Sequence, residues 1–147
     1  MTIVRVLIID DSVTMRAMLE QVISADHECQ VVGVAANAET AFALLTSCRP
    51  DVITLDLTMP GIDGLQFLRI VREKRHPPIV VVSSVSRAGA GETDLALKAG
   101  ASACFDKACL LANVPLFLRT LKKAARCKKA ALRVQKSREV VSDSNPF

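Results

Sequence analysis

Aromatic side chains are nearly missing from this chain of 147 residues, which contains no Trp, no Tyr and only five Phe. Because 50% of the residues are nevertheless hydrophobic, we expect a core built mainly from aliphatic side chains. No window holds about 18 uninterrupted apolar residues, which argues against a membrane span. The N-terminus also lacks the small-residue cleavage site of a signal peptide. We therefore expect a cytoplasmic globular protein.

Cysteine and histidine patterns that bind metals or form disulfides are also missing. The five cysteines are odd in number and contain no C-x-x-C pair, and there are only two histidines. Neither a zinc site nor a disulfide framework is indicated by these spacings. We expect reduced cysteines that serve as small apolar side chains.

The net charge of +4 is unevenly distributed along the chain. Residues 119–138 carry nine Lys and Arg and no acidic residue, whereas residues 1–118 carry 13 acidic and 10 basic residues. Residues 1–118 are therefore mildly acidic. We predict a domain over residues 1–125, followed by a basic helical extension and disordered tail over residues 126–147. We interpret the extension as a solvated continuation of the last helix. A patch for phosphate groups or anionic membranes, and a partner-docking or homodimer surface, stay open as alternatives.

Five apolar, β-branched runs alternate with helical patterns along the chain. Strands are predicted at 3–9, 31–36, 52–55, 79–82 and 102–105, and helices at 13–25, 38–48, 65–74, 93–99 and from 113 onward. Ser12 and Asn37 are suited to cap the first two helices, and the Ser-, Gly- and Ala-rich segment 83–91 is predicted to be a loop. Runs that are apolar throughout indicate strands buried on both faces. The pattern therefore predicts an α/β fold with a doubly wound, five-stranded parallel sheet.

Polar residues follow four of these strands at their carboxyl ends. Asp10 and Asp11 follow the first strand, Asp56 follows the third, Ser83 ends the fourth, and Lys107 comes shortly after the fifth. The carboxyl ends of parallel strands form the ligand-binding edge of an open sheet, so these groups should converge. Clustered carboxylates need a neutralising cation, and oxygen ligands suit Mg²⁺. A carboxylate beside Mg²⁺ and Lys can attack phosphorus and form an acyl phosphate.

Four segments, VLIIDDS, DVITLDLTMPGIDG, IVVVSS and KAGAS followed by DK, resemble a response-regulator receiver domain over residues 3–121. The resemblance implies a flavodoxin-like (βα)5 fold with strand order 2-1-3-4-5. It also implies that Asp56 accepts a phosphoryl group from a histidine kinase or phosphotransfer protein. Ser83 would then be the switch hydroxyl and Lys107 would pair with the phosphate. The Mg²⁺ ligands implied are Asp10, Asp11, Asp56 and the backbone carbonyl of Thr58.

The chain departs from the receiver pattern at two positions near the last strand. Ala108 follows Lys107 where most receivers have Pro, and Cys104 stands where the aromatic switch residue is usual. The neighbouring Phe105 should face the other side of the strand, because successive side chains alternate. We expect an altered relay from the hydroxyl to this position and unaltered phosphorylation chemistry.

We interpret the chain as a stand-alone receiver, a signalling switch and not a metabolic enzyme. Phosphorylation would alter the face made by the fourth helix, the fifth strand and the fifth helix, and thereby the contacts with a downstream protein partner. An aspartyl-phosphate phosphatase is disfavoured, because Leu57 and Thr58 follow Asp56 where that class needs a second acid.

Two further alternatives concern what lies around the predicted receiver. VSSVSRAGAGETDLALKAGA resembles the receiver half of chemotaxis methylesterases, and the chain would then be the regulatory part of such a protein. The ending SNPF resembles a natural C-terminus, and we therefore favour the interpretation that the chain is a stand-alone receiver. A DNA-binding regulator acting through the basic extension is disfavoured, because no recognition-helix pair or interleaved aromatic residues accompany the charges.

Overall fold

Strands and helices alternate up to residue 112 in the computed structural model, which describes residues 2–59, 61–74 and 76–127. In chain order the elements are β1 (Val4–Ile9), α1 (Val13–Ser24), β2 (Cys29–Ala35), α2 (Ala38–Cys48), β3 (Val52–Leu55), α3 (Gly64–Arg72), β4 (Ile79–Ser83), α4 (Val85–Lys98), β5 (Ala103–Asp106) and α5 (Lys107–Ala112). A further helix, here called the C-terminal helix, covers residues 114–127 of the described chain. None of the described helices has the length and apolar character of a membrane span.

The five strands form one parallel sheet in the order β2-β1-β3-β4-β5, which confirms the predicted topology. Every residue of β3 and β4 is buried, whereas the edge strands β2 and β5 are largely half-buried. This burial explains why the central strands are apolar throughout, since helices cover both of their faces.

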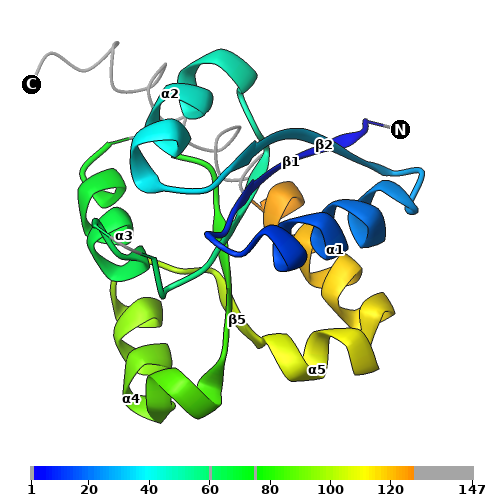
Figure 1. Cartoon of the computed structure of the whole chain (residues 1–147). Coiled ribbons are helices and arrows are strands. Elements are labelled where there is room, and N and C mark those ends of the chain that lie inside the picture. Colours follow the sequence, from blue (N-terminus) through cyan, green and yellow to red (C-terminus); the bar gives the residue numbers. More distant parts are fainter. Residues whose placement is uncertain (1, 60, 75, 128–147) are drawn as a thin grey trace, which may run out of the picture.

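The helices form two layers, one on each face of the sheet (Figure 1). One core cluster joins the sheet to α2, α3 and α4, and it includes a stacked pair of rings, Phe42 and Phe67, with centroids 5.0 Å apart. The other joins the sheet to α1, α5 and the C-terminal helix, where Phe105 and Phe117 meet edge to face at 5.5 Å. With so few aromatic rings, the remaining core is aliphatic, as the composition predicted.

Short polar side chains fix where several helices begin. The Ser12 hydroxyl accepts a hydrogen bond from the Met15 N–H at 3.2 Å, and the Asn37 side chain accepts one from the Thr40 N–H at 2.8 Å. Both predicted caps are therefore confirmed. α2 ends at Cys48 with Arg49 in the left-handed conformation (φ 49°), directly before Pro50. This ending follows from the steric restriction that proline places on the residue before it.

The segment predicted as a loop, residues 83–91, is the clearest local error of the sequence analysis. α4 begins at Val85 and runs to Lys98 without a break, so the helix includes Gly89 and Gly91. Glycine costs a helix about 1 kcal/mol relative to alanine, but packing of the rest of the helix can outweigh this cost. Here the buried Ala96 and Ala99 anchor the C-terminal half of α4 on the sheet.

The last helical segment also differs from the prediction, because it starts earlier and is interrupted. α5 begins directly after β5, and Asn113 (φ −146°, ψ 64°) separates it from the C-terminal helix. The Asn113 side chain accepts a hydrogen bond from the Leu116 N–H at 3.3 Å and so caps the next helix. Pro115 lies in the first turn, where its missing N–H is not needed. Of the predicted basic extension, residues 128–147 lie outside the described residues.

Candidate functional site

The carboxyl end of the sheet brings acidic residues from two adjacent strands together. The Asp10 N–H donates to the Ala35 carbonyl at 3.0 Å, and the Asp56 N–H donates to the Ile9 carbonyl at 2.9 Å. These bonds extend the sheet ladders by one residue, so the backbone of both acids is held by the central strands. Carboxylate oxygens of Asp10, Asp11 and Asp56 lie within 4.8 Å of one another. The predicted acidic cluster therefore exists in the fold.

Asp10 is a buried carboxylate whose two oxygens have different surroundings. Its side chain is 1% exposed, and Oδ1 accepts a hydrogen bond from the Ser12 N–H at 2.9 Å. Oδ2 accepts no hydrogen bond of good geometry and faces the Lys107 ammonium at 3.2 Å. The Arg16 guanidinium donates to the Asp10 carbonyl at 2.8 Å. The sequence analysis missed this contact of Arg16, although Arg16 lies one helical turn after Ser12, whose carbonyl accepts the Arg16 N–H at 2.9 Å.

Asp56 is the second buried carboxylate, and its charge is only partly compensated. Burial raises the pKa of Asp56 to about 7, and the neighbouring charge of Asp10 acts in the same direction. The Thr58 N–H, which donates to Oδ1 at 3.1 Å, and the Lys107 ammonium, 3.5 Å from Oδ2, lower this pKa. Two buried carboxylates thus share one ammonium, and negative charge is in excess at this edge.

A divalent cation fits this excess of charge. Three carboxylates from the end of β1 and the end of β3 present oxygen atoms to one point, and Asp10 Oδ2 lacks a hydrogen-bond donor. Hard cations such as Mg²⁺ prefer oxygen ligands. Asp11 is exposed, so the cluster is open to solvent on one side. These residues therefore fit a magnesium ion better than a zinc ion, which prefers nitrogen and sulfur ligands.

Lys107 and Ser83 come to the same edge from the next strands. Lys107 is the first residue of α5, and its side chain is 24% exposed while its ammonium contacts both buried acids. Ser83 is the last residue of β4, is 3% exposed and pairs in register with Asp106 at the end of β5. Ion pairs thus join Lys107 directly to the acids, whereas Ser83 lies at the same edge without a direct contact to Asp56 among the described residues.

The loop after β3 is held closely against the backbone of Asp56. Gly64 opens α3, and its N–H donates to the Leu57 carbonyl at 3.0 Å. A Cβ atom at this position would lie 2.5 Å from the Asp56 carbonyl oxygen and from the Leu57 Cα. Only glycine permits so close an approach. The Asp63 side chain completes the turn by accepting a hydrogen bond from the Gln66 N–H at 2.9 Å.

The two positions that depart from the receiver pattern take distinct places near β5. Cys104 is half-buried on the face of β5 towards α4, with Sγ 3.9 Å from the Thr93 carbonyl, and burial raises the pKa of its thiol. Phe105 lies in the cluster on the opposite face, which confirms its predicted orientation. The Ala108 N–H, which a proline would lack, donates to Asp106 Oδ1 at 3.1 Å, so the Asp106 side chain caps α5.

Comparisons with known proteins agree with this geometry. A family model described as the response regulator receiver domain matches residues 6–118. A protein-glutamate methylesterase/protein-glutamine glutaminase of Agrobacterium fabrum is 45% identical over 103 residues, which are 70% of this chain and 29% of that protein. A protein of the same description from Rhizobium johnstonii is 39% identical over 144 residues, which are 97% of this chain and 40% of that protein. The chain therefore spans less than half of the length of these curated relatives.

A solved structure gives the same result for the fold. The crystal structure of the response regulator domain of Thermotoga maritima CheB superposes with a TM-score of 0.77 and is 31% identical in sequence. The match covers 84% of this chain and 97% of that domain.

Proposed function

The chain belongs to the family of response regulator receiver domains, and we propose that it is a Mg²⁺-dependent phosphoreceiver whose phosphoryl acceptor is Asp56. The observation that carries this proposal is the group of three carboxylates within 4.8 Å, with the Lys107 ammonium 3.2 Å from Asp10 and 3.5 Å from Asp56. A histidine kinase or phosphotransfer protein of a two-component system supplies the phosphoryl group, as the family implies.

We assign the metal ligands to Asp10, Asp11, Asp56 and the backbone carbonyl of Thr58. When bound, Mg²⁺ supplies positive charge that neutralises the acids and the oxygen atoms of the transferring phosphoryl group. The buried Oδ2 of Asp10 supports this assignment, because it has no well-formed hydrogen bond and its ion pair is with the Lys107 ammonium, which it shares with Asp56. A bound ion would offset the repulsion between Asp10 and Asp56.

In the transfer step, a carboxylate oxygen of Asp56 forms a bond to phosphorus while the bond from phosphorus to the donor nitrogen breaks. The electron pair of the broken bond stays with the donor imidazole, and the product on this chain is an acyl phosphate. Lys107 neutralises negative charge on the phosphoryl oxygens. The Thr58 N–H, already bonded to Asp56, keeps the carboxylate oriented. Ser83 then donates its hydroxyl proton to a phosphoryl oxygen in a hydrogen bond.

Output follows from a shift between two conformations that exist before phosphorylation. The hydrogen bond from Ser83 draws the end of β4 towards Asp56 and alters the start of α4. Cys104 is too small to act as the aromatic switch of the family, so the change passes to the face of α4, β5 and α5 through contacts such as that between the Cys104 thiol and the Thr93 carbonyl. In a stand-alone receiver, the output is the binding of a downstream protein that prefers one conformation of this face.

A second function, regulation of an attached methylesterase, is favoured by one observation. The relatives described above carry the methylesterase/glutaminase name and match this chain over 29–40% of their length. The mass of the protein purified after expression from its native gene distinguishes the two. A mass of 15.8 kDa supports the stand-alone receiver, and a mass more than twice as large supports the regulatory part of a larger enzyme.

The proposal is tested by intact mass after incubation with acetyl phosphate and Mg²⁺. We expect one added phosphoryl group on the natural chain, and none after Asp56→Ala or in the presence of a chelator. Asp94→Asn, which removes an exposed carboxylate of α4, serves as the matched control and should be phosphorylated normally. Addition of phosphate to the Asp56→Ala protein, or calorimetry that detects no Mg²⁺ binding together with no phosphorylation, would overturn the proposal.

A further inference from the structure

A hollow runs along the C-terminal helix at the end of the molecule opposite the acidic cluster. Its volume is about 760 Å³, and the wall contributed by the helix includes Pro115, Leu118, Arg119, Lys122, Lys123 and Arg126. Asp26, in the turn between α1 and β2, lines the other side. Glu28 precedes β2, and its carbonyl accepts the Val4 N–H at 2.8 Å, so this hollow lies at the amino ends of the strands.

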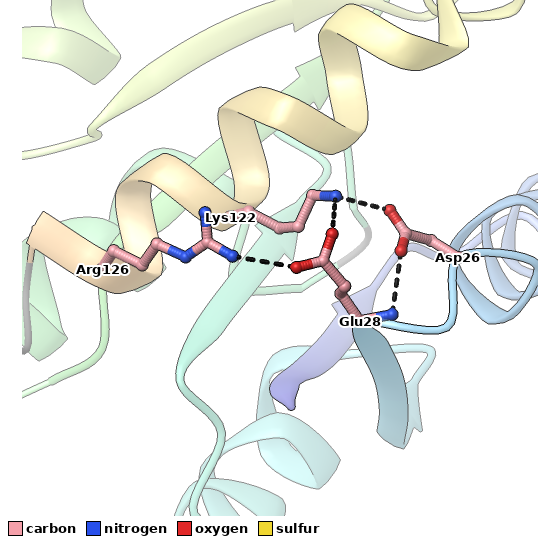
Figure 2. Close-up of polar contacts among 4 residues, drawn as sticks. All are labelled: Asp26, Glu28, Lys122 and Arg126. Atoms are coloured by element: carbon pink, nitrogen blue, oxygen red, sulfur yellow. Dashed lines mark hydrogen bonds and ion pairs between the residues drawn. The ribbon is translucent and has the colours of Figure 1, made fainter. Parts of the chain in front are cut away.

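One edge of the hollow already binds carboxylates (Figure 2). The Lys122 ammonium lies 2.8 Å from Asp26 Oδ2 and 3.1 Å from Glu28 Oε1, and the Arg126 guanidinium lies 3.2 Å from Glu28 Oε2. These residues are more than 90 positions apart in the sequence, and their contacts fasten the C-terminal helix to the start of β2. Lys122 and Arg126 thus have acidic partners within the chain.

The other edge carries cations without such partners. Arg119 and Lys123 are exposed, and neither pairs with an acidic side chain in the part of the chain that the structure describes. Their spacing of four residues places both on one side of the helix, a turn apart. Pro115 and Leu118 add an apolar wall, with Pro115 exposed and Leu118 half-buried. The hollow therefore combines two free cations with an apolar surface.

We propose that this hollow is a docking site for an acidic peptide segment that also carries an apolar side chain. Two carboxylates of the segment pair with Arg119 and Lys123, in the manner in which Asp26 and Glu28 pair with Lys122 and Arg126. The apolar side chain of the segment packs on Pro115 and Leu118. This proposal does not depend on Asp56 or on the proposed phosphorylation, because none of its residues belongs to the acidic cluster.

A peptide fits this site better than a nucleic acid does. A phosphate backbone is recognised by rows of cations, and it would meet the carboxylate of Asp26 on the far wall of the hollow. It also has no apolar side chain for the wall formed by Pro115 and Leu118. Charge complementarity and apolar contact together therefore favour a protein segment, and its binding should weaken as salt is added.

Fluorescence anisotropy of the full chain with three labelled probes tests the proposal. The first probe is a helical peptide with Glu at positions i and i+4 and Leu between them, the second replaces both Glu with Gln, and the third is duplex DNA. We expect the Glu peptide to bind about tenfold more tightly than the Gln peptide. The expected size follows from two exposed ion pairs of up to about 1 kcal/mol each.

A matched pair of double variants locates the binding. Arg119→Glu with Lys123→Glu should weaken binding of the Glu peptide by about tenfold or more, because attraction becomes repulsion. Lys128→Glu with Lys129→Glu makes the same change of charge further along the sequence and should alter the affinity by less than about threefold. Equal losses in both double variants, equal binding of the Glu and Gln peptides, tighter binding of DNA, or no peptide binding would each overturn the proposal.

Discussion

The hydroxyl of Thr54 allows a quantitative test of how the sheet that carries Asp56 is stabilised. Thr54 lies in β3, is 1% exposed, and its Oγ1 has no hydrogen-bond partner. Its register partners, Ile8 of β1 and Val80 of β4, are fully buried aliphatic residues. A buried hydroxyl without a partner costs about 1–3 kcal/mol, and a methyl group in its place gains about 0.8 kcal/mol from burial.

Thr54→Val keeps the branched shape of the side chain and removes the unpaired hydroxyl. Because the tight packing of Ile8 and Val80 offsets part of the gain, we expect the free energy of unfolding to rise by about 1 kcal/mol. For a chain of this size the melting temperature should rise by about 3 °C. Thr120→Val is the matched control, since its Oγ1 donates to the Leu116 carbonyl at 2.8 Å, and the same change should leave stability unchanged or lower it.

Urea unfolding followed by far-ultraviolet circular dichroism measures both variants, because the chain has no Trp or Tyr for fluorescence. The midpoint for Thr54→Val should rise while the denaturant dependence stays the same. If Thr54→Val lowers the midpoint as much as Thr120→Val does, the hydroxyl has a partner such as a buried water molecule, and the reasoning is refuted.

Three further perturbations address charge. Asp56→Asn should raise the melting temperature by about 3–5 °C without Mg²⁺, because it relieves repulsion between buried acids, and calorimetry with added Mg²⁺ should show a smaller difference. The hydrogen bond from Lys122 lowers the pKa values of Asp26 and Glu28, so their stabilisation is present above about pH 5 and is lost as pH falls through the carboxyl range. Melting curves of Lys122→Met should therefore depend less on pH between about 3 and 5, and equal slopes would contradict this. Arg5→Met should cost about 1 kcal/mol in urea unfolding, because the guanidinium donates to the last carbonyls of α2, and an unchanged midpoint would contradict that role.

The topology and the position of the site follow from local sequence patterns. Apolar runs identify buried strands, and residues such as Asp10 and Asp56 are placed at one edge because they end parallel strands. Short-range caps such as Ser12 are predictable for the same reason, since the partner N–H lies within one turn. The parallel order then fixes which residues share an edge.

Features that depend on tertiary packing were not predictable from the sequence. Gly89 and Gly91 favoured a loop by propensity, but packing elsewhere in α4 keeps them helical. The ion pair between Lys122 and Asp26 joins residues 96 positions apart, and no local sequence pattern predicts such a contact. The raised pKa of Asp56 likewise arises from burial in the folded chain, which the local sequence does not specify.

The close contact between Gly64 and the Asp56–Leu57 peptide restricts which parts of the switch can move. The backbone of Asp56, the proposed phosphoryl acceptor, is bonded to Ile9 on one side and packed closely against the Gly64 turn on the other, which leaves it little room to move. The proposed response to phosphorylation then comes from the parts across from it, at the end of β4 and the start of α4. The backbone around Asp56 is thus the fixed part of the switch, and the segments facing it are the movable part. Substitutions that loosen the fixed part should make the two conformations less distinct.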